Sequence, residues 1–319
     1  MSEGYSAVVF GEELLNYSFP GDHPMHRRRL EPFWEELKKL IKANKVKVFP
    51  PNLAREEDLL LFHTDEYVNF VKEKSKEGRG FLDYGDTPAY PGCFESASYV
   101  VGATLKGLEL IFRENYIHVF VPMAGLHHAK RNSASGFCIF NDIGVAINKA
   151  RRDYGVRDIL YIDIDAHHGD GVFYEFLSDP YLYIADIHED GRFLYPGTGG
   201  RHERGEKDAF GTKLNIPLLP GASDEDLLTA LKEIEDFSME FKTELIILQA
   251  GVDGIQNDPI THLNYTSDGY EKFIKGVHEL SHKICDGKLL ILGGGGYNPE
   301  NTKDGWLRVV KVINHNYGG

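Results

Sequence analysis

In Tyr161-Ile-Asp-Ile-Asp-Ala-His-His-Gly-Asp-Gly171, an apolar run ends in a cluster of aspartates and histidines. A buried, unpaired carboxylate is costly, so acids at the end of a strand usually lie beside a cation. Asp163, Asp165 and His167 occupy alternate positions and point to one side of an extended chain. Their carboxylate oxygens and imidazole nitrogen suit a divalent metal ion, so we expect a metal site at the end of a buried strand.

Apolar runs like this one recur along the chain, and helix-like segments lie between them. The expected strands are residues 7–10, 46–49, 118–121, 159–164, 181–187, 214–217, 245–249 and 289–292. The expected helices are residues 30–43, 57–74, 94–115, 142–154, 223–241 and 268–285. Many of the strand-like runs are continuous rather than alternating, which is typical of strands covered on both faces. The alternation of strands and helices predicts an α/β fold with a mostly parallel sheet.

The whole chain, residues 1–319, is expected to form one domain, because no linker, repeat or low-complexity tract divides it. Long surface loops are expected at residues 76–92 and 192–209. In open parallel sheets, ligands bind beyond the carboxyl ends of the strands. Polar motifs follow four expected strands, at residues 125–129, 163–170, 249–254 and 293–298. We therefore expect these motifs to converge in space.

Composition excludes several classes of function. The formal net charge of −14 argues against nucleic-acid binding and favours a cationic substrate, although the charge alone is explained more simply by solubility. No run is long and apolar enough to span a bilayer, and the first residues lack the pattern of a signal peptide. Cys93, Cys138 and Cys285 are far apart and odd in number, which favours a reducing cytoplasm over a disulfide framework.

Asp165, His167 and Asp253 form the expected metal site. Three protein ligands that leave one position open for water and substrate are the pattern of a catalytic zinc ion. Fe²⁺ accepts similar ligands, so both metals stay open. Asp253 alone would be interpreted as a turn residue before Gly254, but it follows an expected strand and so joins the set.

Acid–base residues are expected beside the metal. His127 and His128 are neighbours at the end of a strand, a position that favours proton transfer over a structural role. Asp163 and Asp170 could each hold one imidazole and so separate the pKa values of the two histidines. Tyr297 follows four glycines, which allow close backbone approach, and its hydroxyl could stabilise a developing oxyanion.

Motifs for other kinds of catalysis do not occur. The chain has no phosphate-binding loop and no Gly-x-Ser-x-Gly elbow. The glycines at 293–296 precede Tyr-Asn-Pro rather than a dinucleotide-binding helix. These absences point to hydrolysis by metal-activated water.

Taken together, the motifs resemble those of the zinc-dependent histone deacetylase family, which includes acetylpolyamine amidohydrolases and prokaryotic deacetylase-like proteins. The resemblance covers nearly the whole chain, through residues 23–27, 63–67, 125–129, 195–199 and 293–297. It implies an arginase/deacetylase-like α/β fold with three layers around a central, mostly parallel eight-stranded sheet. It also implies hydrolysis of an N-acetyl amide to a free amine and acetate.

The resemblance implies a role for each catalytic residue. The three expected metal residues correspond to zinc ligands. His128, with Asp170 behind it, corresponds to the main general base and then acid, and His127 is paired with Asp163. Tyr297 corresponds to the tyrosine that polarises the substrate carbonyl.

A substrate channel is implied as well. Gly136 and Phe137 resemble one wall of an acyl-lysine tunnel, and Tyr195 stands where the second wall usually has phenylalanine. Asp86 resembles a rim aspartate that grips the substrate backbone. Arg27 resembles the arginine of an inner acetate pocket.

Two departures from the family pattern leave details open. Asp186 stands where the family has a serine of a monovalent-cation site, so a K⁺ site is open and would be more strongly charged. The run Asp258-Pro-Ile260 resembles acetylpolyamine enzymes, but their long insertion near residues 76–92 is missing. The substrate therefore stays open between acetyl-lysine in proteins and an acetylated polyamine.

Two other functions compete with deacetylation. An arginase-like ureohydrolase with two Mn²⁺ ions needs further carboxylates where Gly169 and Gly251 stand, which disfavours it. A catalytically silent module that binds acetylated ligands would lack a metal ligand or Tyr297, and this chain has the full set.

Overall fold

The computed structural model describes residues 5–314. Within them, one sheet of eight strands has the order β2-β1-β3-β8-β7-β4-β5-β6, and every neighbouring pair is parallel. The strands are β1 (Tyr5–Val9), β2 (Val48–Phe49), β3 (Tyr116–Val121), β4 (Ile159–Asp163), β5 (Leu182–Glu189), β6 (Lys213–Leu218), β7 (Leu245–Gln249) and β8 (Leu289–Leu292). The predicted α/β fold class is confirmed, and each expected strand lies close to its expected position.

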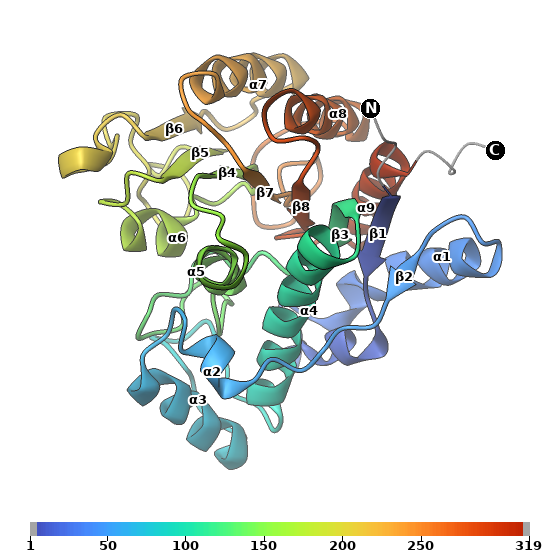
Figure 1. Cartoon of the computed structure of the whole chain (residues 1–319). Helices are drawn as coiled ribbons and strands as arrows, with labels where there is room; N and C mark the ends of the chain where they lie inside the picture. Colours follow the sequence, from blue (N-terminus) through green and yellow to red (C-terminus); the bar gives the residue numbers. More distant parts are fainter. Residues whose placement is uncertain (1–4, 315–319) are drawn as a thin grey trace.

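Helices cover both faces of the sheet and make three layers (Figure 1). One face carries α4 (Cys93–Arg113) and α5 (Asp142–Tyr154). The other face carries α7 (Asp224–Ser238), α8 (Ser267–Ile284) and α9 (Pro299–Ile313), with α1 (Glu31–Lys42) against α9. The remaining helices are α2 (Glu56–Leu59), α3 (Asp65–Glu77), α6 (Asp170–Glu175) and the 3₁₀ turns η1 (Glu12–Asn16), η2 (Arg27–Arg29) and η3 (Lys207–Ala209).

The layers explain why the strand sequences are continuously apolar. Every residue of β4, β7 and β8 is buried, because helices cover both sides of these central strands. Helix starts follow ordinary capping chemistry: the Asn141 side chain accepts a hydrogen bond from the Gly144 amide, and Ser223 and Asp226 form a capping box.

Two helical segments differ from the sequence-based expectation. The expected helix 57–74 is split into α2 and α3, because the chain turns at residues 60–64 and Thr64 caps a new helix. In that turn, His63 Nε2 accepts a hydrogen bond from the Asn141 amide at 2.9 Å, which anchors the turn to the segment before α5. Helix α9 was missed altogether, although Asn298 caps it and Pro299 opens it.

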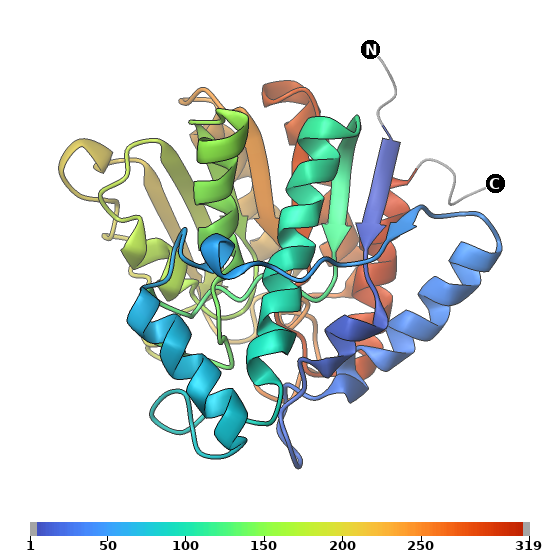
Figure 2. The ribbon, with the colours of Figure 1, turned by 60° about the horizontal axis from the view of Figure 1, so that its bottom comes forward.

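The topology brings the predicted motifs together. Strands β3, β8, β7 and β4 are consecutive neighbours in the sheet, and each of the four polar motifs follows one of them. Since the strands are parallel, all four motifs leave the sheet at the same edge, toward which the arrowheads point in Figure 2. The expected convergence is therefore confirmed.

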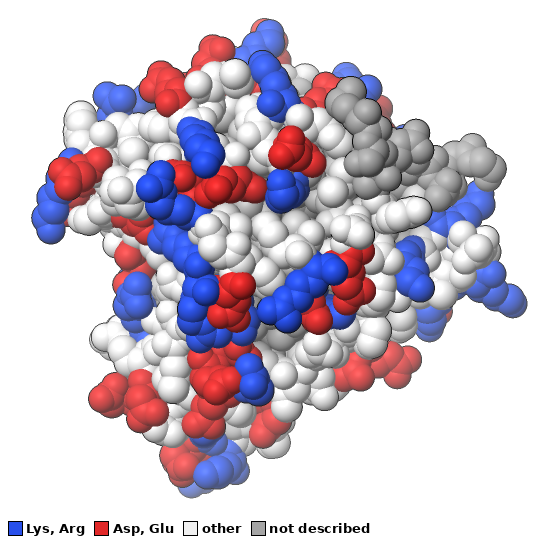
Figure 3. Space-filling model, viewed as in Figure 1, with Lys and Arg blue, Asp and Glu red and all other residues white. Residues whose placement is uncertain are grey.

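The charged side chains on the surface fit the expectation that the protein does not bind nucleic acid. On the face shown in Figure 3, acidic and basic side chains are interspersed rather than gathered into one basic footprint. Many of them pair locally along helices, as Lys106 does with Glu109 and Glu114. Among residues 5–314, none of the helices has the length and apolar character needed to cross a membrane.

Candidate metal centre and active site

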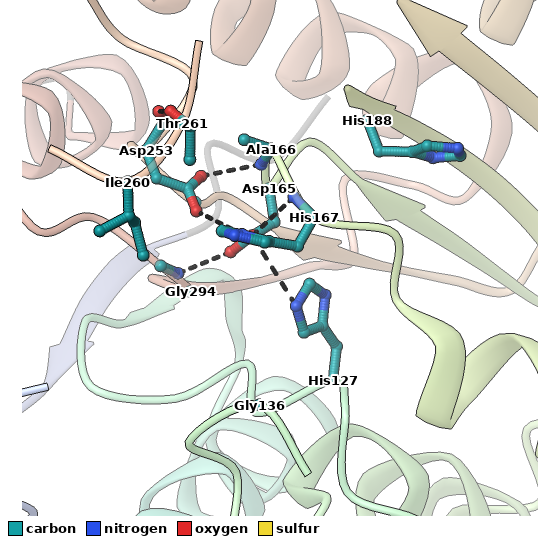
Figure 4. Close-up of polar contacts among 12 residues, drawn as sticks. His127, Gly136, Asp165, Ala166, His167, His188, Asp253, Ile260, Thr261 and Gly294 are labelled. Carbon is teal, nitrogen blue, oxygen red and sulfur yellow. Dashed lines mark hydrogen bonds and ion pairs between the residues drawn. The ribbon is translucent and has the colours of Figure 1, made fainter. Parts of the chain in front are cut away.

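Asp165, His167 and Asp253 meet at the carboxyl edge of the sheet (Figure 4). Asp165 and His167 lie in the loop after β4, and Asp253 lies in the loop after β7. One ligand atom from each falls within 4.8 Å of the others. His167 Nδ1 lies 3.0 Å from Asp165 Oδ1 and 3.0 Å from Asp253 Oδ2. The predicted metal residues thus form one buried O, N, O cluster.

Backbone and amide donors hold the two carboxylates in place. Asp165 Oδ2 accepts hydrogen bonds from Gln249 Nε2 at 2.8 Å and from the Gly295 amide at 2.7 Å. Asp253 Oδ1 accepts one from the Ala166 amide at 2.8 Å. Each carboxylate therefore keeps one oxygen directed at His167 Nδ1, which leaves the cluster preorganised for a cation.

The electrostatics of the cluster fit a divalent ion. Burial, together with the charge of Asp165, raises the pKa of Asp253 to about 7. Burial lowers the pKa of His167, but its two carboxylate neighbours outweigh that and raise it to about 10. A proton on Nδ1 thus compensates two buried acids, and a metal ion in its place would supply more charge to the same three donors. The donor set suits Zn²⁺ and also Fe²⁺.

The tandem histidines lie beside this cluster, each with its predicted aspartate. His127 Nδ1 lies 2.8 Å from Asp163 Oδ2, and His128 Nδ1 lies 2.7 Å from Asp170 Oδ1. The Nε2 atoms of the two histidines are 3.1 Å apart, and His127 Nε2 is 3.8 Å from Asp165 Oδ1. Both rings therefore turn their free nitrogen toward the metal residues.

The two Asp–His pairs have opposite electrostatics. For His127, burial lowers the pKa, but Asp163 and Asp165 outweigh burial and raise it to about 10. For His128, burial and then the charge of His127 lower the pKa to about 4 in spite of Asp170. At neutral pH one imidazole is cationic and the other is neutral, so His128 can accept a proton.

The site has no room for the carboxylates of a second metal. A Cβ atom on Gly169 would lie 2.6 Å from Asp163 Oδ2, and one on Gly251 would lie 2.6 Å from Asp165 Oδ2. Real side chains do not tolerate such contacts, so glycine is required at both positions by the packing around Asp163 and Asp165. The two-manganese alternative is weakened further.

Tyr297 projects from the glycine-rich loop after β8, and a buried arginine supports that loop. Arg29 donates from Nε to the Gly296 carbonyl at 2.6 Å and from Nη2 to the Gly294 carbonyl at 2.8 Å. Its guanidinium also lies 5.6 Å from the centre of the Tyr297 ring. Arg29 therefore positions the tyrosine.

The expectation for Arg27 is wrong. Its side chain is 46% exposed and pairs with Glu31 on the surface. Residues 27–29 form η2, in which successive side chains point in different directions, and Arg29 is the one that turns inward. Any inner pocket beside Tyr297 would therefore have Arg29 in its wall.

Sequence comparisons agree with this geometry. Residues 23–313 match the model of the histone deacetylase domain. The chain belongs to the histone deacetylase family. It is 38% identical over 301 residues to the acetoin utilization protein AcuC of Bacillus subtilis (strain 168), covering 92% of this chain and 78% of AcuC. It is 34% identical to AcuC of Staphylococcus xylosus, with the same coverage of 92% and 78%.

Solved structures of histone deacetylase homologues share the fold. The HDA15 HD domain superposes with a TM-score of 0.88 at 26% identity, covering 97% of this chain and 89% of that one. An HDAC homologue from Aquifex aeolicus gives a TM-score of 0.85 at 28% identity, with 97% and 83% coverage. An HDAC homologue complexed with SAHA gives the same TM-score, identity and coverage.

Two supports of this deacetylase-family site were missed by sequence reasoning. Asp142, the first residue of α5, accepts hydrogen bonds from the Gly125 and Leu126 amides at 3.0 and 2.7 Å and so braces the loop that carries the tandem histidines. Asp258 accepts a hydrogen bond from the Tyr297 amide at 2.8 Å. From the sequence, Asp258 stands out only as part of the Asp-Pro-Ile run and Asp142 only as the first residue of an expected helix.

Two of the predicted channel residues, Tyr195 and Phe137, lie beside His128 and Tyr297 respectively. The ring centre of Tyr195 is 5.1 Å from that of His128, and its hydroxyl lies 2.5 Å from Ser135 Oγ. The ring of Phe137 packs 5.9 Å from that of Tyr297. A Cβ atom on Gly136 would lie 2.4 Å from His128 Cδ2, so only glycine lets this loop approach the histidine.

Tyr195 also lines a cavity of about 600 Å³, here called the rim, whose lining includes Asp83, Asp86 and Lys130. Asp83 organises the rim loop, because its Oδ1 accepts hydrogen bonds from the Gly85 and Asp86 amides at 3.0 and 3.1 Å. Asp86 is exposed as a residue, but partial burial of its carboxyl group and the adjacent Asp83 raise its pKa to about 6. The rim is therefore acidic.

Asp186 is already engaged by neighbouring groups. Its Oδ1 lies 2.6 Å from His188 Nδ1, and its Oδ2 accepts a hydrogen bond from the Gly169 amide at 2.9 Å. His188 Nε2 lies 2.9 Å from the Gly199 carbonyl, so the imidazole bridges β5 and the following loop. A K⁺ site at Asp186 stays a prediction.

Proposed function

We propose that this chain is a metal-dependent deacetylase that removes the acetyl group from N-acetylated amines. The observation that carries the proposal is the joining of one Asp165–His167–Asp253 cluster to two Asp–His pairs at the same sheet edge. This combination supplies three donors for Zn²⁺, a neutral base and a cationic imidazole within a buried site.

Each residue of the site has a separate role in amide hydrolysis. The metal ion, when bound, supplies Lewis-acid polarisation and lowers the pKa of water. His128 Nε2 takes the proton of the attacking water, and Asp170 holds its ring in the required tautomer. Tyr297 donates a hydrogen bond to the oxyanion that develops on the acetyl carbonyl. A histidinium then protonates the leaving amine, so proton transfer balances over the cycle.

Replacing Tyr297 by phenylalanine tests the oxyanion role. We expect Tyr297→Phe to lower kcat for acetate release by about 10²–10³-fold, because one oxyanion donor is removed while the ring packing on Phe137 is kept. Zinc content should change little, since the metal ligands are untouched. Steady-state rates with an acetyl-lysine peptide give the measurement, and wild-type rates in this variant would exclude Tyr297 from catalysis.

We propose that the substrate is cationic, either acetyl-lysine in a protein or an acetylated polyamine. The support is the acidic rim, whose lining includes Asp83 and Asp86. An acidic rim attracts cations and raises their local concentration. The choice between the two substrate classes depends on measured rates rather than on the rim. An acetylated polyamine keeps protonated amines, whereas acetyl-lysine is a neutral amide whose peptide gains positive charge only from flanking Lys and Arg residues.

The rim gives a pH-dependent preference. Asp86 is neutral below a pKa of about 6 and charged above it. The ratio of kcat/KM for a cationic over a neutral acetyl amine should therefore rise about three- to fourfold from pH 5 to pH 7, as expected for ~1 kcal/mol of attraction in a wet site when Asp86 goes from mostly neutral to mostly ionised. The protonation of the catalytic residues affects kcat/KM for both substrates equally, so its pH dependence cancels in the ratio.

Asp86→Asn should make this ratio independent of pH, while the exposed control Asp208→Asn should keep the wild-type rise. A ratio that stays flat in the wild-type protein would contradict the assignment of the rim.

Three further properties belong to the same proposal. We propose a single catalytic domain over residues 1–319 and a cytoplasmic location, the latter supported by three buried cysteines that are all free thiols. We propose no nucleic-acid partner, given the net charge of −14. The silent binding module is disfavoured by the complete catalytic set, and acetate release decides between the two.

A further inference from the structure

A second cluster of metal-binding side chains lies away from the active site. His118 is the third residue of β3, and His278 and His282 are one turn apart on α8. His118 pairs with Leu289 at the start of β8. The cluster is thus near the amino edge of the sheet, opposite to the carboxyl edge that carries the catalytic residues (Figure 2).

The three imidazoles are arranged as ligands of one ion would be. A ring nitrogen from each lies within 4.8 Å of the others. Ligand nitrogens on a tetrahedral Zn²⁺ ion, each about 2.05 Å from the metal, lie about 3.3 Å apart. The Nε2 atoms of His118 and His282 are 3.1 Å apart, close to that separation. The ring centres are 4.4 to 4.9 Å apart, so the three imidazoles form one compact cluster.

The fold supports this arrangement from both sides. His278 and His282 have the i, i+4 spacing that puts two imidazoles on one helix face, a spacing used in helical metal sites. Both belong to the C-terminal part of α8, which ends at Ile284, and the negative end of the helix dipole favours a cation there. His118 is buried, whereas His282 is exposed, so an ion has a rigid ligand and an entry path.

We propose that His118, His278 and His282 form a second metal site, which binds one divalent transition-metal ion such as Zn²⁺. In the metal-free protein, one of the two close Nε2 atoms carries a proton and the other accepts it. When the ion binds, the ring that carries the Nε2 proton changes tautomer and holds the proton on Nδ1, so both Nε2 atoms are ligands of neutral imidazoles. Such nitrogen ligands suit Zn²⁺, Ni²⁺ and Cu²⁺ and not Mg²⁺ or Ca²⁺. The exposed side leaves a position for water.

The ion would cross-link β3 and α8, because His118 lies on the strand and the other two ligands lie on the helix. The strand that carries His118 continues, at its other end, into the loop of the tandem histidines. The cross-link therefore fixes the N-terminal part of β3, the strand whose C-terminal end leads into the active site. It also changes the meaning of metal stoichiometry, because two ions per chain would not by themselves indicate a binuclear catalytic centre.

Zinc content in matched variants tests the proposal. Untagged protein is dialysed to equilibrium against buffered micromolar Zn²⁺ and analysed for metal and protein. We expect two ions in the wild type, one in His278→Gln/His282→Gln and one in Asp165→Asn/Asp253→Asn. The combination of all four changes should bind none, and the exposed control His202→Gln should bind two. Far-UV circular dichroism confirms that each variant is folded.

The outcomes separate this proposal from the proposed function. Wild-type zinc content in the His278/His282 variant, or none in the Asp165/Asp253 variant, would overturn the second site. Loss of an ion only in the His278/His282 variant would keep the second site and overturn the catalytic metal.

A thermal readout supports the assignment without relying on activity. In Asp165→Asn/Asp253→Asn, added Zn²⁺ should still raise Tm, because the ion binds the native cluster and not the unfolded chain. The rise should disappear when His278 and His282 are also changed to glutamine. An equal rise in both variants would contradict binding at this cluster.

Discussion

Asp253→Asn is expected to remove the catalytic metal and to lower kcat/KM for acetate release by about 10³-fold or more, since a catalytic metal supplies several kcal/mol of transition-state stabilisation. The residue is fully buried, and one of its oxygens faces His167 Nδ1 at 3.0 Å. Asparagine keeps the volume and the acceptor for the Ala166 amide but loses the charge. Zinc content and acetate release measured on the same preparations check the expectation.

The Tm of the zinc-free protein serves as a control for loss of folding in Asp253→Asn. Burial and repulsion from Asp165 raise the pKa of Asp253, so its ionised form is a destabilising element when no metal is present. Asp253→Asn should therefore leave the zinc-free Tm equal or higher at neutral pH. The exposed variant Asp208→Asn should keep wild-type activity. A lower zinc-free Tm together with full activity in Asp253→Asn would contradict the metal assignment.

His128→Ala is expected to lower kcat by about 10²–10⁴-fold with little change in KM or catalytic zinc content. His128 is the neutral member of the tandem pair, because burial and the charge of His127 lower its pKa to about 4. Its removal takes away the proton acceptor and leaves Asp165, His167 and Asp253 in place. Steady-state kinetics with metal analysis check this result.

His202→Ala, an exposed histidine outside the site, serves as the control and should match the wild type. A His128→Ala protein that turns over at more than about a tenth of the wild-type rate would show that another group is the base.

The fold was predictable because its strands are covered on both faces. Burial of β4, β7 and β8 leaves continuous apolar runs whose ends are marked by polar motifs. Convergence of the site followed from one rule, that parallel strands deliver their carboxyl ends to one edge. The residues of the candidate metal cluster and the tandem histidines could be singled out because buried acids and paired histidines are rare at such positions, and the structure places them together.

Residues that hold the site through long-range contacts could not be predicted from sequence patterns. Arg27 and Arg29 carry the same side chain, and only the direction of η2 decides that Arg29 supports the Tyr297 loop. The division between α2 and α3 depends on His63, whose partner Asn141 is far away in sequence. Helix α9, by contrast, had a readable pattern, with Trp306 and Val310 one turn apart behind an Asn-Pro start.

The most direct test of the central claim is acetate release by zinc-loaded wild-type protein. The panel pairs an acetyl-lysine peptide with N-acetylated polyamines, each measured with and without a chelator and after zinc is restored. We predict that acetate is released, that the chelator abolishes the release and that zinc restores it. The substrate with the higher rate identifies the substrate class. No release from any acetyl amide, by protein shown to hold zinc at Asp165, His167 and Asp253, would contradict the account.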